Sequence, residues 1–362
     1  MKTKNILHIS PDFNYSCGVS QYVFSLLRNF SQDQSYKLFF ITNGGNALER
    51  IRDINITPII INFSKGAKNL FNFYPNLRYL SKFCIQNNID IIHTHHRYPE
   101  YLAYLVSKNT DIKTITTVHS IVSGKYNFSF KSDKIICVSN SVRQILCDHY
   151  KISPQKITML HNFIEIPDFT EQSTNLNIKS ILGIREDEKV VLFIGRVTKD
   201  KGIDLLIEAF RLLRQEDKKV FLIIAGQIYD STLKSSLKNL PDGVKFLGIV
   251  KTPYPYYEAA DLIALPSKVD SFPYIMLEAA IMRKPFLGTR IGGISEFIDE
   301  GITGTLFTSG NVKELSNKIR YLLDNQNIAN NMADKLYEKV SKELSRESYI
   351  TKLNKIYDGL LV

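Results

Sequence analysis

Two successive runs of short apolar segments alternating with amphipathic stretches constrain the fold of this chain most. In the first half, seven segments have the length and composition of buried strands: NILHIS, YKLFFITN, ITPIIINF, DIIHTH, KTITTVH, KIICVS and KITMLH. Stretches such as VSQYVFSLLRNF lie between them, and their apolar residues recur at helical spacing. Because strands that alternate with helices form a parallel sheet covered on both faces, the pattern predicts a doubly wound α/β domain.

The pattern stops once and then restarts. Residues 166–180 are polar and aperiodic, which predicts a linker. Further strands are expected at VVLFIGR, VFLIIAG, VKFLGIV, LIALPS and PFLGTR, and helices from Gly202, near Ser231 and around Glu278. After Asn311 the patterns are helical to the end. We therefore expect two domains, residues 1–168 and 178–345, each with a ligand site at the carboxyl ends of its strands.

The composition argues against several classes of protein. Hydrophobic residues make up 44% and charged residues 23% of the chain, which is typical of a globular protein. The apolar segment near the N-terminus is too short for a signal peptide, and no segment approaches the roughly 18 apolar residues of a membrane span. Four cysteines without a CxxC pair do not indicate a disulfide framework or a zinc finger. We expect a cytoplasmic protein.

The positive charge is concentrated in the first half. Residues 1–165 hold 19 Lys+Arg and 10 Asp+Glu (+9), whereas residues 166–362 hold 27 and 26 (+1). Such asymmetry indicates an anionic partner, but no nucleic-acid-binding motif is present, so we expect no nucleic acid. Residues 64–83 mix Lys65, Lys68, Arg78 and Lys82 with aromatic side chains. This mixture suits peripheral contact with an anionic membrane, or a solvated amphipathic helix.

The stretch FIGRVTKDKG has the properties of a phosphate site. Arg196 and Lys201 follow a strand and precede a helix that is expected to start near Gly202. Backbone N–H groups, the helix dipole and both side-chain charges favour an anion there. The alternative is a pair of solvated surface cations. The chain has no GxxxxGK[ST] or GxGxxG motif.

The stretch DSFPYIMLEAAIM places two carboxylates around the start of a helix. Asp270 lies in the loop, Pro273 fits the first helical turn, and Glu278 follows about one and a half turns later. A carboxylate in an otherwise apolar helix is costly unless it is paired. Glu278 is therefore expected either to form a structural ion pair or to accept hydrogen bonds from a diol such as a ribose.

These two stretches together resemble glycosyltransferase family 4, the large family of retaining, nucleotide-sugar-dependent glycosyltransferases also called group 1. The similarity extends through nearly the whole chain, including CGVSQYVFSLL, DIIHTHH, TTVHS, KIICVSNSV and SYITKLNKIYDGLL. The resemblance implies the α/β fold called GT-B, with two facing Rossmann-like domains. It also implies that the last helix, at about residues 346–362, crosses back to the first domain.

The resemblance implies a role for each matching residue. Glu278 would bind the ribose, and Arg196 and Lys201 would hold the donor pyrophosphate. Asp270, where the family has a glutamate, would lie against the donor sugar. The family often has glycine where this chain has Pro273, which cannot donate a hydrogen bond. The remaining donor contacts implied are Gly18 and His119 toward the sugar, Ile249 and Val250 toward the base, and the N–H groups of Phe272, Tyr274 and Ile275.

Three further histidines, His93, His95 and His96, resemble metal ligands by composition. No carboxylate completes a ligand set, and the family usually needs no metal, so we expect none and assign these histidines to the acceptor. His119 lies at a strand end, where a histidine is either structural or, as the resemblance implies, in contact with the donor sugar.

The sequence therefore predicts a retaining transferase. It would move a sugar from a nucleoside diphosphate, with UDP or GDP expected, to a hydroxyl of a glycan or lipid-linked acceptor, without a cofactor. Capsule, exopolysaccharide or lipopolysaccharide assembly is the setting that the family implies, at the inner face of the membrane. The alternatives are a sugar-nucleotide epimerase on the same fold and a non-catalytic nucleotide-sugar- or glycan-binding protein. The sequence does not indicate an oligomeric state.

Overall fold

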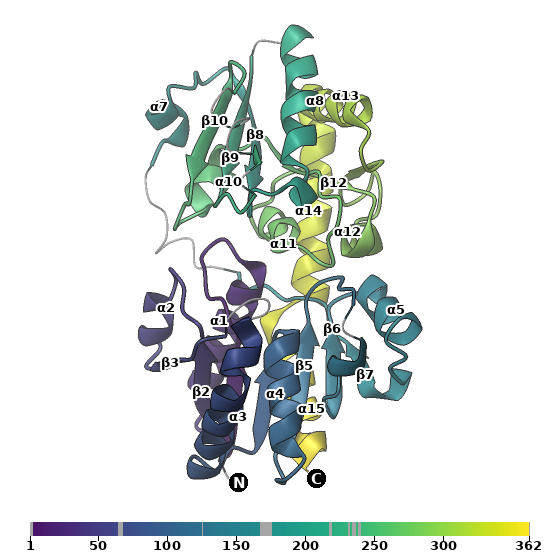
Figure 1. The fold of residues 1–362 in the computed structure, drawn as a ribbon. Coiled ribbons are helices and arrows are strands. Elements are labelled where there is room, and N and C mark those ends of the chain that lie inside the picture. The colour runs from purple at the N-terminus through teal and green to yellow at the C-terminus, as the bar shows by residue number, and fades with distance from the viewer. Residues whose placement is uncertain are drawn as a thin grey trace. The chain divides into compact units, whose positions relative to one another are not determined.

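The protein divides into two compact units. The structure, a computed structural model, describes residues 3–63, 68–124, 126–166, 176–216, 219–230, 232–233, 237 and 240–361. Unit 1 comprises Met1–Asn162 and Arg346–Val362, and unit 2 comprises Phe163–Ser345 (Figure 1). Most of the expected linker and the helix expected near Ser231 fall outside the described residues.

Unit 1 contains a sheet of seven parallel strands in the order β3-β2-β1-β4-β5-β6-β7. The strands are β1 (Lys4–Ile9), β2 (Tyr36–Thr42), β3 (Pro58–Ile60), β4 (Ile91–Thr94), β5 (Lys113–Val118), β6 (Lys134–Cys137) and β7 (Ile157–Met159). Each corresponds to one of the seven segments predicted from the sequence. Residues of β1 and β4 are almost all buried, as expected for a parallel sheet with both faces covered.

Helices connect and cover these strands. They are α1 (Gly18–Ser31), α2 (Glu49–Arg52), α3 (Lys68–Gln86), α4 (Arg97–Ser107), α5 (Asn140–Asp148) and α15 (Arg346–Leu361), with 3-10 turns at Tyr126–Phe128 and Pro154–Lys156. The first helix starts at Gly18, so this glycine is its first residue.

The last helix, α15, belongs to unit 1 although the rest of the C-terminal half does not. Figure 1 shows it in yellow beside the strands of unit 1. Its buried Tyr349 hydroxyl lies 2.5 Å from the hydroxyl of Tyr22 in α1, and its buried Tyr357 hydroxyl lies 2.7 Å from Nδ1 of His93. The predicted return of the last helix to the first domain is confirmed.

Unit 2 contains a second parallel sheet, in the order β10-β9-β8-β11-β12-β13. The strands are β8 (Lys189–Ile194), β9 (Val220–Ala225), β10 (Val244–Gly248), β11 (Leu262–Leu265), β12 (Phe286–Thr289) and β13 (Thr305–Phe307). Five were predicted. The sixth, β13, was missed because its three residues are too few to show a periodicity.

In unit 2 the helix that begins near Gly202 and the helix that contains Glu278 were predicted, whereas those at Ile178–Leu182, Tyr254–Ala259 and Gly292–Phe297 were not. The helices of unit 2 are α7 (Ile178–Leu182), α8 (Ile203–Glu216), α10 (Tyr254–Ala259), α11 (Tyr274–Ile281), α12 (Gly292–Phe297), α13 (Val312–Asp324) and α14 (Gln326–Glu343), with a 3-10 turn, η3, at Lys199–Lys201. Pro273 is the N-cap of α11, with φ −77° and ψ 138°, so it precedes the first turn instead of lying in it. The expectation of helices alone beyond Asn311 is confirmed.

Each sheet has one point where the chain reverses its direction of travel across the sheet. In unit 1 this point lies between β1 and β4, and in unit 2 between β8 and β11. Loops leave such a pair of neighbouring strands in opposite directions, which opens a crevice at the carboxyl ends where ligands of doubly wound sheets bind. The loops after these four strands are therefore the candidate ligand-binding segments.

Candidate active site

The cationic loop of unit 2 follows β8 directly. It contains the exposed Arg196, and then η3 brings Lys201 to the start of α8. Gly202 ends the turn in the left-handed region, with φ +71°. A Cβ atom at this position would lie 1.9 Å from the carbonyl oxygen of Pro266, just after β11. A glycine is thus required for the loop to approach the end of the neighbouring strand.

The acidic stretch follows β11 and leads into α11. Glu278 is partly exposed, whereas every other residue of this helix is buried. The hydroxyl of Tyr257, in α10, donates a hydrogen bond of 2.5 Å to Oε2 of Glu278. Burial and the neighbouring carboxylate raise the pKa of the Tyr257 phenol well above its usual value, so it stays a donor. A neutral hydroxyl therefore orients the carboxylate of Glu278.

The cationic and acidic stretches meet at the reversal point of the sheet. Lys201 Nζ forms an ion pair of 2.5 Å with Oδ2 of Asp270, and the side chains are only 17% and 9% exposed. The hydroxyl of Ser267 donates a hydrogen bond of 3.1 Å to the same oxygen of Asp270. The backbone N–H of Lys268 donates to the carbonyl of Asp200 at 2.7 Å. Two segments nearly 70 residues apart thus form one charged cluster at the β8–β11 crevice.

The other donor-site candidates of unit 2 lie on the same edge of the sheet. Ile249, 43% exposed, and the partly exposed Val250 follow β10. Phe272, Tyr274 and Ile275 are buried at the start of α11. Exposed apolar residues beside β10 can contact a flat base, whereas the buried residues can offer only backbone groups.

In unit 1 the candidate residues are at the corresponding edge. Gly18 is exposed at the start of α1, after an N-cap, Cys17, that makes no side-chain hydrogen bond. His119 follows β5 and is partly exposed. His96 is the N-cap of α4 and is also partly exposed, whereas His93 and His95 are buried in and just after β4.

Four imidazoles form a connected cluster at this edge, in which His95 contacts the other three. Nδ1 of His8, in β1, is 3.3 Å from Nε2 of His95, and Nδ1 of His95 is 3.3 Å from Nε2 of His119. Nδ1 and Nε2 of His93 are 2.7 Å from the Tyr357 hydroxyl and 2.8 Å from the Thr117 hydroxyl. Burial lowers the pKa of His8 to about 3 and lowers the pKa values of the other three histidines, so all four are neutral at pH 7.

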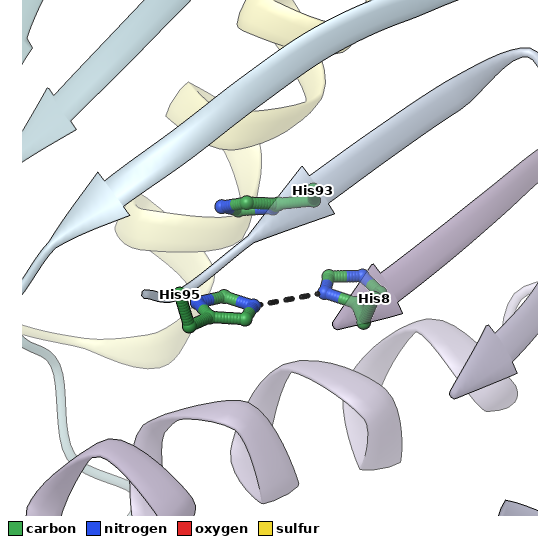
Figure 2. A group of neighbouring side chains, drawn as sticks. All are labelled: His8, His93 and His95. Atoms are coloured by element: carbon green, nitrogen blue, oxygen red, sulfur yellow. Dashed lines mark hydrogen bonds between the residues drawn. The ribbon is translucent and has the colours of Figure 1, made fainter. Parts of the chain in front are cut away.

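Within the described part of the chain, three of these histidines form the group that could hold a metal ion. One ligand nitrogen each from His8, His93 and His95 lie within 4.8 Å of one another. Figure 2 shows these three side chains. However, both nitrogens of His93 already have hydroxyl partners, and the group includes no carboxylate to balance the charge of a divalent cation. The arrangement fits a network of neutral imidazoles better than a metal centre.

Sequence reasoning did not single out two residues of these sites. Tyr257 is hydrogen-bonded to Glu278 but lies 21 residues before it in the sequence, and no local sequence pattern predicts this contact. His8 could have been noticed, because a histidine inside the apolar run NILHIS has to be buried or to face a crevice.

Comparisons with known proteins cover both units. The family described as Glycosyl transferases group 1 matches residues 175–339, and the family described as Glycosyltransferase Family 4 matches residues 17–166. The N-acetyl-alpha-D-glucosaminyl L-malate synthase of Bacillus anthracis is 29% identical over 76% of each chain. The lipopolysaccharide 1,2-N-acetylglucosaminetransferase of Salmonella typhimurium is 36% identical over 35% of this chain and 37% of its own.

A solved structure with the same fold is Anabaena Alr3699/HepE in complex with UDP-glucose. It is 17% identical to this chain, covers 98% of it and 99% of its own length, and gives a TM-score of 0.83. The predicted fold class, GT-B with two parallel Rossmann-like sheets, is confirmed by this match.

Proposed function

Because the chain belongs to glycosyltransferase family 4 and is therefore a nucleotide-sugar-dependent glycosyltransferase, we propose that the charged cluster of unit 2 binds the donor. Arg196 and Lys201 bind its pyrophosphate, and Glu278, oriented by Tyr257, accepts hydrogen bonds from the ribose hydroxyls. Ile249 and Val250 contact the base. The N–H groups of Phe272, Tyr274 and Ile275 add backbone contacts, while Asp270, Gly18 and His119 contact the sugar. UDP and GDP are the nucleotides expected.

The observation that carries this proposal is the ion pair between Lys201 and Asp270. It joins the loops that follow β8 and β11, the two strands between which the sheet of unit 2 reverses. Doubly wound sheets bind nucleotides at this point. An ammonium held at 17% exposure is weakly screened by water, so an anionic phosphate beside it gains more than it would from a solvated lysine.

The same geometry supports glycosyl transfer with retention. As the bond between the sugar and the diphosphate breaks, negative charge builds up on the leaving phosphate, and Arg196 and Lys201 stabilise this charge. The departing phosphate can itself accept the proton of the acceptor hydroxyl, which then attacks from the same face. No protein side chain is needed as general base in this scheme. Of the three histidines considered for the acceptor, His96 is the partly exposed one, and we assign the acceptor contact primarily to it.

A ligand-binding experiment tests the donor site. Thermal unfolding would be followed with UDP, GDP, ADP, CMP and their sugar conjugates, for the wild type and for Glu278→Gln. A ligand at 100 times its dissociation constant adds about 2.7 kcal/mol to the free energy of unfolding. We expect one nucleotide to stabilise the wild type and to lose its effect in Glu278→Gln, whereas Glu258→Gln, an exposed glutamate of α10, serves as the matched control.

The nature of the product separates transfer from the two alternatives. A transferase releases nucleoside diphosphate and forms a glycoside only when an acceptor is present. An epimerase would isomerise the donor without an acceptor, and a binding protein would leave it unchanged. If none of these ligands stabilises the protein, the proposed donor site is refuted.

We further propose a lipid-linked acceptor in bacterial surface polysaccharide assembly, reached from the cytoplasmic face of the membrane. The described part of α3 supports this proposal. Phe71 is 85% and Tyr74 78% exposed, and the exposed cations Arg78 and Lys82 line a shallow surface groove with Ile85. Exposed aromatic rings beside cations suit an anionic leaflet, where each cation contributes about 1 kcal/mol. Lys65 and the Lys68 side chain lie outside the described residues, and none of the described helices meets the length and hydropathy required to cross a membrane.

Vesicle flotation tests the membrane contact. Vesicles with anionic lipid should retain the wild type at low salt, and neutral vesicles should not. The quadruple variant Phe71→Ser, Tyr74→Ser, Arg78→Gln, Lys82→Gln should lose retention. The control variant carries Tyr321→Ser and Lys313→Gln, which remove an exposed aromatic ring and an exposed cation from α13 of unit 2. Equal retention of the quadruple and control variants would refute a role for α3.

A further inference from the structure

Two buried imidazoles, those of His8 and His95, and the partly exposed imidazole of His119 form a hydrogen-bonded series that ends at His119. The series starts at His8 in β1, continues through His95 just after β4, and reaches His119 just after β5. Both nitrogen–nitrogen distances are 3.3 Å, and the ring centroids are 5.6 Å and 5.5 Å apart. Figure 2 shows the contact between His8 and His95 as a dashed line. Each contact requires one proton between its two nitrogens.

The histidine series begins at His8. Nε2 of His8 is buried, and among the residues that the structure describes it has no hydrogen-bond partner. A neutral imidazole carries one proton, on either Nδ1 or Nε2. If His8 carried it on Nε2, a buried N–H would have no acceptor, which native proteins rarely tolerate. His8 therefore carries its proton on Nδ1 and donates it to Nε2 of His95.

The proton on Nδ1 of His8 determines which nitrogens of His95 and His119 carry their protons. Because Nε2 of His95 accepts a hydrogen bond, the single proton of His95 is on Nδ1 and is donated to Nε2 of His119. The proton of His119 is then on Nδ1. His93 does not belong to this series of hydrogen bonds, because the hydroxyls of Tyr357 and Thr117 satisfy both of its nitrogens.

We propose that His8 and His95 are positioning residues that set the tautomer of His119, so that His119 presents an N–H group, and not a bare nitrogen, to the donor sugar. The proposal rests on the proposed function, which places His119 against that sugar. It adds that His119 acts as a hydrogen-bond donor to a sugar oxygen. Its other nitrogen is occupied by His95, so His119 does not take the proton of the acceptor hydroxyl.

Nuclear magnetic resonance of the full-length protein with isotope-labelled histidine shows directly which ring nitrogen of each histidine carries the proton. Long-range proton–nitrogen correlations distinguish the two tautomers for each of the seven histidines, which single substitutions assign. At pH 7.5 we expect His8, His95 and His119 all to carry the proton on Nδ1, the form that a free histidine side chain favours less. A proton on Nε2 of His119 would refute the proposal, whatever the activity of the enzyme.

A matched pair of substitutions tests the consequence for binding. His95→Asn places an amide N–H close to the position of Nδ1–H, whereas His95→Leu has nearly the same shape and no donor. In His95→Leu we expect His119 to lose the fixed tautomer, the KM for the nucleotide sugar to rise about ten-fold, and the affinity for the nucleotide alone to stay unchanged. His95→Asn should restore the KM. Equal KM values for the two variants would contradict a positioning role.

Two other outcomes separate this proposal from its rivals. If the tautomers are as expected but His119→Ala leaves the KM for the nucleotide sugar unchanged, the proton order stands and the proposed sugar contact is refuted. If zinc shifts the signals of His8, His93 and His95 together, or a chelator changes them in the purified protein, the cluster is a metal site and the proposal is overturned.

Discussion

Acidification should destabilise unit 1, because the histidines in its core are neutral. His8, His93 and His95 are 0–3% exposed, and burial holds their pKa values far below the ordinary 6.5, to about 3 for His8. A depressed pKa means that the unfolded chain binds protons before the folded one does. The stability is therefore complete above pH 6.5 and is lost as the pH falls toward 3. Between pH 7.5 and 5.5 each of these histidines lowers the free energy of unfolding by about 1.4 kcal/mol, or about 4 kcal/mol for the three, and the partly exposed His119, whose pKa burial also lowers, adds to this loss.

The cysteines offer a probe that reports on unit 1 alone. All four lie in this unit, and Cys84 is fully buried in the core beside α4. With Cys17 and Cys147 replaced by serine, urea unfolding can be followed by a short pulse of a pyridyl disulfide, which labels thiols at acidic pH. Mass spectrometry then gives the labelled fraction, and hence the free energy of unfolding, at each pH.

A single substitution gives the internal check. His8→Leu removes one titrating group, so the decrease in the free energy of unfolding between pH 7.5 and 5.5 should be smaller by about 1.4 kcal/mol. A change in stability that is equal at both pH values does not affect this difference. His149→Gln, an exposed histidine after α5, is the control and should leave the loss unchanged. A wild-type loss below about 1 kcal/mol would refute the assignment of neutral, buried histidines.

Three further predictions concern unit 2. Tyr257→Phe should weaken binding of the preferred nucleotide by about five- to ten-fold in calorimetry, because Glu278 loses its oriented partner, whereas Tyr256→Phe should not. Gly202→Ala should destabilise unit 2 by about 1–3 kcal/mol more than Gly183→Ala in urea unfolding, since both glycines have φ near +70° but only the first would clash with backbone. Asp270→Asn should tighten binding of the free nucleoside diphosphate several-fold and make it more salt-sensitive, because Lys201 loses its counter-charge; weaker binding would show that the ion pair is needed to position Lys201.

The sheets were predictable from the sequence because parallel strands are continuous apolar runs. VFLIIAG has this character and forms β9, in which five of six residues are buried, and the mostly apolar YKLFFITN forms β2, in which four of seven are buried. The cationic loop was predictable for a similar reason, since a strand, two cations and a glycine in that order define a local structure. β13 was missed because three residues carry too little pattern.

Long-range polar contacts could not be predicted. Glu100 of α4 is fully buried and accepts hydrogen bonds from the backbone N–H groups of Phe130, Lys131 and Ser132, a partnership that depends on packing across about 30 residues. The same holds for Tyr257 and Glu278, whose contact follows from the packing of α10 near α11. The local sequence specified which elements form, whereas the partners of the polar side chains depend on how these elements pack.

The most direct test of the central claim is a crystal structure with the nucleoside diphosphate that stabilises the protein best. We expect phosphate oxygens within about 2.7–3.2 Å of Arg196 and Lys201, and a ribose hydroxyl donating to Glu278. A nucleotide bound elsewhere, or one whose ribose does not reach Glu278, would contradict the assignment of the β8–β11 crevice as the donor site.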